Sequence, residues 1–286
     1  SAESVPMVMS VPTMSLSIEP TSPATRNVGC SAASRAVIWP EDTKASMWSG
    51  HSSRKTSVSS STAAARTAGV QVVTGDTKVV EKGKGDGVFI TTTGVGALPA
   101  GRNPGGAQAR PGDAVLVSGT LGDHGMAILA QRESLAFESQ IVSDSAALNG
   151  VVEALYAAVP AEAIHVLRDP TRGGLASTVN EIASQSRVGV ELDEAAIPVA
   201  AQVHAACELL GLDPLIIANE GKLVVVCADA AAEAALAALR AHPLGAAAAC
   251  IGRITEDARC FVQLRTRLGG RRMVDWLSAE QLPRIC

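Results

Sequence analysis

The sequence has 286 residues, of which 47% are hydrophobic and only 2% aromatic, so Ala, Val, Leu and Ile have to build the core of one large domain or two ordinary ones. The formal net charge of −4 is spread along the chain, and no apolar run reaches the roughly 20 residues of a membrane span, which argues against nucleic-acid and membrane partners. The six cysteines form no CxxC pair and no secretion signal is visible, so we expect a cytoplasmic protein without a zinc cluster or a disulfide framework.

Residues 1–61 differ in composition from the rest of the chain. They contain 16 serines but a single leucine, Leu16, and they show neither the period of a strand nor that of a helix. We interpret this segment as atypical, with a composition typical of disorder. From Ala63 onward the pattern is that of a globular α/β protein.

The first elements after this break are two predicted strands. The β-branched run "GVQVVTGDTKVV" (69–80) predicts a strand that ends in a polar turn, and "DGVFITTTGVG" (86–96) predicts a second one. The stretch at 96–113 is rich in Gly and Pro and therefore resembles a linker. We accordingly expect one domain to end near residue 111 and another to begin at 112.

Downstream of this boundary, strands and helices alternate, and Gly211 is positioned to end one of the helices. In chain order we predict a strand–turn–helix unit at 112–133, a helix at 147–159, a strand–loop–helix unit at 163–186, a strand at 188–199, a helix at 200–211, two strands around a turn at 214–228, a helix at 230–243, and strands at 247–255 and 259–266.

The stretch "TGDTK" (74–78) is the first candidate for chemistry. A carboxylate at the end of a strand can hold Mg²⁺, which prefers oxygen ligands, and Lys78 could neutralise a phosphate. A turn in which Asp76 bonds its own backbone explains the same residues. The spacing matches neither a Walker motif nor GxGxxG, so it does not identify a cofactor by itself.

Three further loops carry polar residues beside glycines. In "SGTLGDHG" (118–125), backbone N–H groups could meet an anion, but Asp123 is better explained as a helix N-cap and His124 as a surface residue. In "RDPTRGG" (168–174), the arginine could bind phosphate or simply pair with the aspartate. In "ANEGK" (218–222), Glu220 is a candidate general base or an ordinary turn residue.

From about Gly69 to Cys286 the chain resembles the hydrogenase-maturation carbamoyl dehydratase (HypE) family, a branch of the ATP-dependent superfamily of aminoimidazole ribonucleotide synthetase and selenophosphate synthetase. The matching stretches are "VTGDTKVVEKGKGDGVFITTTGVG", "GDAVLVSGTLGDHGMAIL", "LRDPTRGGLASTVNEIA", "CELLGLDPLIIANEGKL", "HPLGAAAACIGRI" and "LPRIC". GDTK and DPTRGG mark the superfamily, and the final PRIC marks this branch.

The resemblance implies a reaction for the last residue, Cys286. A partner carbamoyltransferase, HypF-like, places a carbamoyl group on the thiol, and ATP then drives its dehydration to a thiocyanate. The cyano group passes to iron on a HypC–HypD-like scaffold and becomes a cyanide ligand of a nickel–iron hydrogenase. The resemblance also implies a homodimer, with ATP and Mg²⁺ as cofactors.

The resemblance assigns roles residue by residue. Glu220 is similar to the family's proposed base, and Asn180 stands in "VNEIA", where some members carry a histidine near the substrate. The expected catalytic residues are Cys286, Glu220, Lys78 and Asn180; the expected nucleotide-binding residues are Gly75, Asp76, Thr77, Lys78, Asp169 and Arg172; and the expected metal ligand is Asp76.

The implied fold is α/β (α+β), with two domains like those of aminoimidazole ribonucleotide synthetase. The remainder of an ATP-binding domain occupies 62–111, a mixed sheet with helices on one side occupies 112–270, and a mobile tail at 271–286 carries Cys286. Residues 1–61 do not match the family. With permissible codons, "VIWPE" (37–41) read in another frame gives Asp-Leu-Ala-Gly, which resembles family sequence, so we hypothesise a frameshift upstream of residue 62.

Two other functions fit the same residues. One is a catalytically impaired adaptor that still binds the maturation partners, which the atypical N-terminal segment favours. The other is a different phosphoryl transfer within the superfamily, which the final PRIC argues against, because a small-molecule kinase needs no carrier tail.

Overall fold

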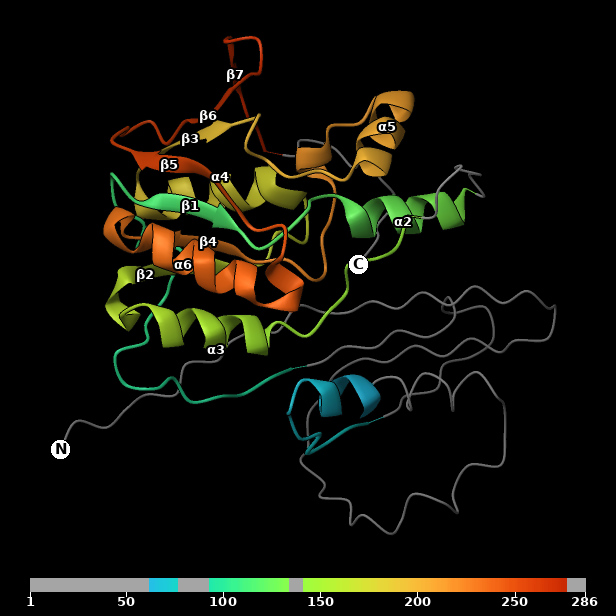
Figure 1. Ribbon diagram of the computed structural model, residues 1–286, viewed down its shortest axis with the longest axis vertical. Coiled ribbons are helices and arrows are strands. Elements are labelled where there is room, and N and C mark those ends of the chain that lie inside the picture. The colour runs from blue at the N-terminus through green and yellow to red at the C-terminus, as the bar shows by residue number, and fades with distance from the viewer. Residues whose placement is uncertain (1–61, 77–92, 134–140, 277–286) are drawn as a thin grey trace. The chain divides into compact units, whose positions relative to one another are not determined.

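The computed structural model describes residues 62–76, 93–133 and 141–276, and Figure 1 shows their course. The chain divides into two compact units, with the boundary after Gly96. In the first unit, residues 62–67 form a helix, and residues 70–76 have no regular structure.

The strand predicted at 69–80 is therefore wrong for its described part. Val70, Val72 and Val73 are 59–69% exposed, and no strand among the described residues pairs with them. A β-branched run becomes a strand only when a neighbouring strand takes up its backbone hydrogen bonds, so propensity alone is not sufficient here. Residues 93–96, at the end of the second predicted strand, also lack regular structure, and the rest of that strand lies outside the described residues.

The second unit is built on a seven-stranded sheet with the order β2-β4-β1-β5-β3-β6-β7. Neighbouring strands are antiparallel except for the parallel pair β3 and β6, so the sheet is mixed as expected. The strands are β1 (Ala114–Val117), β2 (Ile164–Arg168), β3 (Gly189–Asp193), β4 (Val224–Cys227), β5 (Ala249–Thr255), β6 (Val262–Arg265) and β7 (Arg271–Met273).

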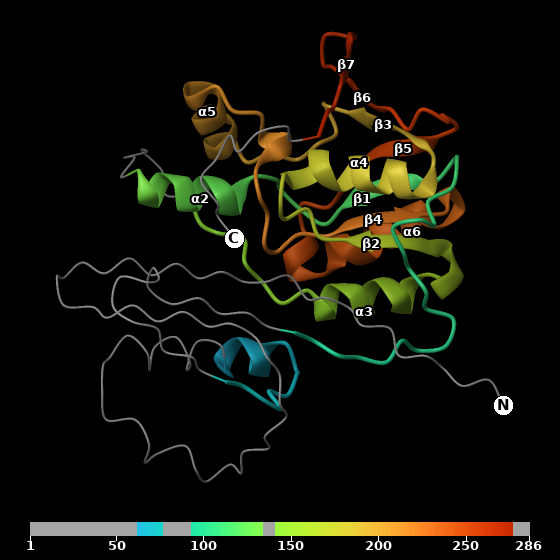
Figure 2. The same cartoon turned by 180° about the vertical axis from the view of Figure 1, so that it is seen from behind.

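Helices cover both faces of this sheet, as Figures 1 and 2 show from opposite sides. The helices are α2 (Asp123–Arg132), α3 (Asn149–Ala158), α4 (Gly174–Ser186), α5 (Ala201–Leu210) and α6 (Asp229–Ala241), with 3-10 turns η2 (Ala161–Ala163), η3 (Pro214–Ile216) and η4 (Pro243–Gly245). The predicted helices at 147–159, 200–211 and 230–243 are confirmed, and Gly211 ends α5 in the left-handed conformation.

The expectation that helices lie on one side of the sheet is wrong. Leu175 and Val179 of α4 pack against one face of the central strands, while Leu155 of α3 and Leu239 of α6 pack against the other. The reason is visible in β4, whose sequence VVVC is buried at every position. A strand that is apolar on both faces needs cover on both faces.

A smaller apolar cluster joins α2 to α5. Met126 and Leu129 of α2 pack with Val203 and Cys207 of α5, and Ile217 completes the contact. Both helices lie beside the sheet rather than on it (Figure 1). This cluster holds the N-terminal end of α2 next to the segment that precedes β4.

Two local predictions fail for identifiable reasons. The first strand expected in 214–228 is the 3-10 turn η3, because Pro214 starts it and the Asp213 carboxylate accepts the N–H of Leu215. Residues 271–273 are expected to belong to the mobile tail, but they form β7 and pair with β6.

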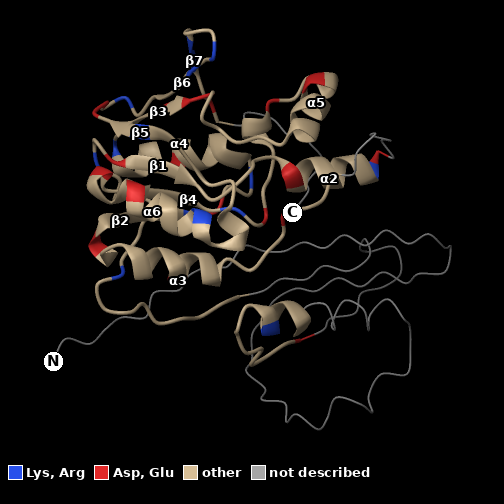
Figure 3. Ribbon diagram, viewed as in Figure 1, with Lys and Arg blue, Asp and Glu red and all other residues tan. Residues whose placement is uncertain are grey.

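Charged residues of both signs are interspersed over the second unit (Figure 3). Two arginines near the β6–β7 hairpin have acidic partners: Arg265 binds Asp193 at 2.5 Å, and Arg272 binds Asp213 at 2.7 Å. Among the described helices, none is both long and apolar enough to cross a bilayer.

Burial separates the cysteines of the second unit into two kinds. Burial raises the pKa of Cys227 to about 12, and the negative charge of Asp113 adds to the effect. Burial likewise raises the pKa of Cys207 to about 11, with a further contribution from Asp213. Cys250, by contrast, is exposed. Because the thiolate is the nucleophile, the two buried thiols are inert near neutral pH.

We predict that iodoacetamide at pH 8 alkylates Cys250 and leaves Cys207 and Cys227 unmodified in the folded protein. At that pH roughly a thousandth or less of each buried thiol is ionised, since its pKa lies about three or more units higher. Peptide mass mapping measures the modification, and unfolding in urea should expose all three cysteines. Equal rates for Cys227 and Cys250 in the native state would contradict the burial described here.

Candidate functional site

The register of three strands brings three loops to one edge of the sheet. Val117 at the end of β1 and Arg168 at the end of β2 both pair with Val224 at the start of β4. The loops that follow β1 and β2 and the segment that precedes β4 therefore meet. These are the loops in which the sequence motifs GTLGDHG, DPTRGG and NEGK stand.

Asn219 connects these loops through its amide. Its Oδ1 accepts the N–H of Gly122 at 2.8 Å, and its Nδ2 donates to the carbonyls of Pro170 and Ile217 at 3.0 Å each. Its own N–H donates to the Pro170 carbonyl at 3.2 Å. Asn219 is only 1% exposed, so these bonds replace the water that its amide and the loop backbones would otherwise need.

Asp144 holds the same loop from another direction. It lies in the segment between α2 and α3, and its Oδ1 accepts the N–H of Glu220 at 3.1 Å. Its Oδ2 accepts from Lys222 Nζ at 2.9 Å, and the same ammonium lies 3.8 Å from Asp123 Oδ2. Glu220 thus stands between two residues whose positions are fixed, Asn219 and Lys222.

Glycine is required at two positions of this junction. A Cβ on Gly221 would lie 1.7 Å from the carbonyl oxygen of Asp144, and a Cβ on Gly174 would lie 2.5 Å from that of Leu215. Gly174 also has a φ of +61°, which side chains other than glycine rarely adopt. The glycines of NEGK and DPTRGG therefore permit a close approach of backbones.

The loop after β1 differs from its prediction in two ways. Gly122 precedes α2 as its N-cap, and Asp123 is the first helical residue, whose carboxylate accepts from Thr120 Oγ1. His124 is buried, not on the surface, and its Nδ1 lies 2.8 Å from Ser143 Oγ. Burial lowers the pKa of His124, against the opposing charge of Asp144, so the neutral imidazole is favoured in the folded protein.

The DPTRGG loop supports itself with internal hydrogen bonds. Asp169 Oδ2 accepts from Thr171 Oγ1 at 2.6 Å, and its carbonyl accepts from Thr178 Oγ1 at 3.3 Å. Arg172 is exposed. These contacts agree with a role for Asp169 in shaping the loop, and nucleotide binding by Asp169 and Arg172 stays a prediction.

Asn180 lies on α4 and contacts the start of the C-terminal segment. Its Nδ2 donates to the carbonyls of Ala176 at 2.8 Å and Val274 at 2.9 Å. Val274 is buried in the core, and its own N–H donates to the carbonyl of Val262 at 2.9 Å. These contacts favour an anchoring role for Asn180, and a direct part in the reaction stays a prediction.

The other predicted site residues belong to segments that the structure describes in part or not at all. Gly75 and Asp76 are exposed in the first unit. Thr77, Lys78 and Cys286 lie outside the described residues. Within the described ranges, no group of three or more His, Cys, Asp or Glu side chains is arranged to hold a metal ion, and Asp76 as a metal ligand stays a prediction.

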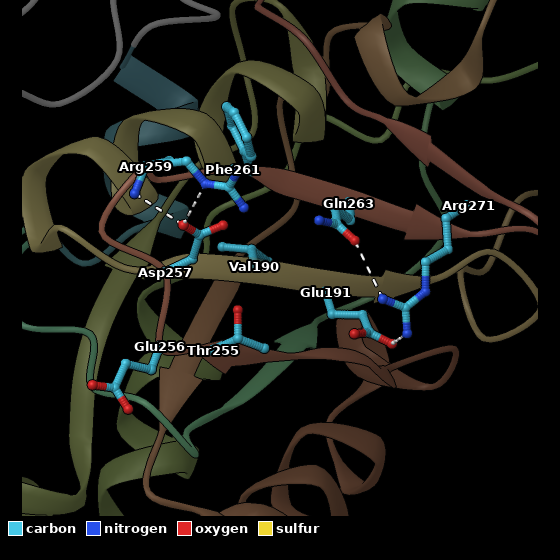
Figure 4. A pocket seen from close by; sticks show the side chains of 9 residues that line it. All are labelled: Val190, Glu191, Thr255, Glu256, Asp257, Arg259, Phe261, Gln263 and Arg271. Carbon is cyan, nitrogen blue, oxygen red and sulfur yellow. Dashed lines mark hydrogen bonds and ion pairs between the residues drawn. The ribbon is translucent and has the colours of Figure 1, made fainter.

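A polar hollow of about 270 Å³ lies on another part of the second unit, near the outer strands of the sheet (Figure 4). Arg271 lies 3.6 Å from Glu191 and 3.4 Å from the Gln263 oxygen, and the Arg259 guanidinium stacks on Phe261 at 4.6 Å. None of the predicted site residues lines it. The lining residues are Val190, Glu191, Thr255, Glu256, Asp257, Arg259, Phe261, Gln263 and Arg271.

Sequence reasoning missed four residues of the junction. Asn219 and Lys222 lie in ANEGK and Asp123 lies in SGTLGDHG, so the available signal for them was their closeness to Glu220 and to the glycines. Asp144 lies in "SDS", between two serines, and no motif marks it. Only the folded structure shows that it contacts Glu220.

Comparison with protein families gives a match over residues 110–265 to the AIR synthase related protein, C-terminal domain. The carbamoyl dehydratase HypE of Cupriavidus necator is 68% identical over 229 residues, which are 80% of this chain and 65% of that protein. The carbamoyl dehydratase HypE of Escherichia coli strain K12 is 49% identical over 232 residues, covering 81% of this chain and 68% of that one. This chain thus spans about two thirds of the length of these relatives.

Solved structures agree with the sequence relatives. Hydrogenase maturation protein HypE in complex with ATP matches with a TM-score of 0.76 and 52% identity, over 80% of this chain and 69% of that one. The HypE protein of a HypE–HypF complex matches with a TM-score of 0.75 and 47% identity, over 78% and 72%. The mixed α/β fold described above is therefore the fold of these proteins.

We predict that Asn219→Ala lowers the free energy of unfolding by on the order of 3 kcal/mol. The change leaves the Gly122 N–H and the Ile217 carbonyl buried without this partner, and each such group costs about 1–3 kcal/mol. Urea denaturation followed by circular dichroism measures the difference. As a control, Asn149→Ala on an exposed site should change stability by less than about 0.5 kcal/mol. Equal effects of the two changes would refute the central role of Asn219.

Proposed function

The chain belongs to the HypE carbamoyl dehydratase family, and from this premise we propose that it dehydrates a carbamoyl group on the thiol of Cys286 to a thiocyanate, with ATP as the second substrate. The observation that carries the proposal is the meeting of three family motifs around Asn219, with Glu220 beside it. That arrangement supplies a carboxylate on a backbone that is held in place, in the loop where the family resemblance expects the base.

The proposed reaction starts from a thiocarboxamide, in which the Cys286 sulfur is bonded to a C(=O)NH₂ group. The amide oxygen attacks the γ-phosphorus of ATP, and ADP leaves. Loss of the two N–H protons and cleavage of the C–O bond then give the S–C≡N group and inorganic phosphate, which carries the former amide oxygen. Phosphorylation is needed because an amide oxygen is a poor leaving group and a phosphate is a good one.

Glu220 is the proposed acceptor of an amide proton. A general base has to lie within about 2.6–3.2 Å of the group that it deprotonates, so its backbone has to be held in place. Asn219 and Asp144 provide that support on either side of Glu220. Proton abstraction makes the nitrogen lone pair available to form the triple bond as the phosphate leaves.

The proposed ATP contacts lie in the first unit. Asp76 would provide an oxygen ligand for Mg²⁺, which commonly uses one or two carboxylates together with phosphate oxygens. Asp76 is the one carboxylate in the part of the first unit that the structure describes, and it is exposed. Gly75, Thr77 and Lys78 complete the proposed phosphate-binding loop, and Mg²⁺ would supply charge neutralisation there.

The length of the C-terminal segment supports transfer within one chain. Val274 is the last buried residue of the described sheet region, and twelve residues follow it up to Cys286. Twelve extended residues span at most about 40 Å. A tail of that reach can bring its thiol to several places around the second unit, including the edge of the sheet where Glu220 lies.

The proposed partners follow from the same premise. A HypE protein similar to this chain has been solved in a HypE–HypF complex, which supports a HypF-like carbamoyltransferase as the donor of the carbamoyl group. A HypC–HypD-like iron scaffold as acceptor, a homodimeric state and a cytoplasmic location are further parts of the proposal.

An adaptor without catalytic activity is the second candidate function. The observation that favours it is the irregular, exposed course of residues 70–76, which include Gly75 and Asp76 of the proposed ATP loop. A calorimetric titration with Mg–ATP separates the candidates. The enzyme has to bind the nucleotide, whereas an adaptor binds only its protein partners.

The carrier role of Cys286 leads to the first functional prediction. After incubation with a HypF-type carbamoyltransferase, carbamoyl phosphate and ATP, the chain should gain the mass of a carbamoyl group or of the cyano product. Cys286→Ala should gain neither, while Cys250→Ala, which removes an exposed cysteine, should react normally. Intact-protein mass spectrometry gives the result, and an unchanged mass gain in Cys286→Ala would end the carrier hypothesis.

The proposed base leads to the second functional prediction. Glu220→Gln keeps the shape of the side chain but removes its ability to accept a proton, so dehydration should slow by about 10²–10⁴-fold and the carbamoylated form should accumulate. Rapid quenching and mass spectrometry measure the rate. The control Glu233→Gln changes an exposed carboxylate on α6 and should react at the normal rate. A normal rate in Glu220→Gln would reassign the base.

A further inference from the structure

We propose that Asp144 is a positioning residue for Glu220: its carboxylate fixes the backbone of the 219–222 loop and so determines where the proposed base lies. The inference rests on the proposed function, because it assigns Asp144 a role through Glu220. It adds a residue that neither the sequence motifs nor the family resemblance indicate.

The two oxygens of Asp144 bind the loop at two points. Oδ1 accepts the backbone N–H of Glu220 at 3.1 Å, and Oδ2 accepts from the side chain of Lys222 at 2.9 Å. One contact alone would let the loop rotate about it. Two contacts, two residues apart on the loop, fix both its position and its direction.

Burial makes this arrangement strong. The side chain of Asp144 is 4% exposed and that of Lys222 is 10% exposed, so water screens their attraction little. The N–H···O⁻ and N⁺–H···O⁻ bonds are charge-assisted, which makes them stronger than bonds between neutral groups. Removing Asp144 would leave Lys222 with Asp123, now 3.8 Å away, as its remaining acidic neighbour. The ammonium would then move toward Asp123 and shift the loop.

The backbone of Asp144 also leaves the loop no room to move closer. A Cβ on Gly221 would lie 1.7 Å from the carbonyl oxygen of Asp144 and 2.7 Å from its carbonyl carbon. The peptide of Gly221 therefore packs directly against the peptide of Asp144. Side-chain contacts pull Glu220 and Lys222 toward residue 144 while backbone contact limits the approach, so the position of Glu220 is set from both sides.

The chemistry makes such positioning consequential. A base acts only within hydrogen-bonding distance of its proton, and a displacement of about 1 Å can cost on the order of 10²-fold in rate. ATP binding, in contrast, is proposed to rest on residues 75–78, Asp169 and Arg172, and the hydrogen bonds described for the Asp144 carboxylate go to Glu220 and Lys222 instead. Loss of Asp144 should therefore reduce the rate of dehydration and leave the ATP concentration for half-maximal rate nearly unchanged.

The test measures single-turnover dehydration of the carbamoylated full-length chain at a series of ATP concentrations. We expect Asp144→Ala to lower the maximal rate by about 10–100-fold, with the half-saturating ATP concentration changed by less than about threefold. Asp144→Asn should be affected less, because its amide oxygen still accepts the N–H of Glu220. The double variant Asp144→Ala/Glu220→Gln should react no more slowly than Glu220→Gln alone, since a positioning residue has no effect once its base is gone.

Asp113 provides the matched control. It is a buried carboxylate before β1, at the opposite end of that strand from the loop 118–122, and it accepts the N–H of Arg110 at 2.7 Å and lies 2.7 Å from His165 Nδ1. It thus binds one backbone N–H and one side chain, as Asp144 does. Asp113→Asn should lower thermal stability and leave the dehydration rate of the folded protein unchanged.

The outcomes separate failure of the inference from failure of the proposed function. If Glu220→Gln dehydrates slowly and Asp144→Ala dehydrates at the normal rate, the inference is overturned and the proposed base is retained. The inference is also overturned if the double variant is slower than Glu220→Gln by the same factor by which Asp144→Ala is slower than the unaltered chain. Asp144 would then act independently of Glu220. A normal rate in Glu220→Gln overturns the proposed base and the inference together. If Asp144→Ala does not fold, the same comparison of single and double variants is made with Asp144→Asn, and its outcomes are interpreted in the same way.

Discussion

The pairing of β4 with both β1 and β2 is the constraint on which the second unit depends. Val224 lies opposite Val117 on one side and Arg168 on the other, so the ends of three strands meet at one edge. Because β4 is buried at every position, α4 has to cover one face and α3 and α6 the other. The short apolar strand β4 therefore determines both where the loops meet and where the helices pack.

The polar junction at the ends of these strands buries polar and charged groups. Asn219, Asp144 and Lys222 are all largely removed from water, and burying such groups is unfavourable unless each finds a partner. Each of them has partners here, and those partners are mostly backbone groups of loops. These hydrogen bonds hold the three loops to one another. Such rigidity is useful where a carboxylate has to meet a substrate at a defined distance.

Much of this arrangement could be predicted from the sequence, and the exceptions share a cause. The helices α3, α5 and α6 follow from apolar spacing and from Gly211, and the loops with candidate chemistry follow from glycines beside charged residues. Apart from the local 3-10 turn η3, the wrong predictions concern contacts between distant segments. Residues 70–76 have the composition of a strand but no described partner, His124 is covered by Ser143, and Asp144 lies 76 residues from Glu220 in sequence. Local sequence patterns do not indicate which distant segments come into contact.

The contact between Asn180 and Val274 affects how tightly the end of the chain has to bind in the proposed reaction. It fixes the point from which the last twelve residues leave the sheet region. A thiol tethered by a short chain is present near its own site at an effective concentration in the millimolar range, whatever the concentration of the protein. If the proposed reaction holds, the carbamoylated end needs no high intrinsic affinity for the site where it reacts. Weak binding then allows the product to depart quickly, which suits a group that has to be delivered to another protein.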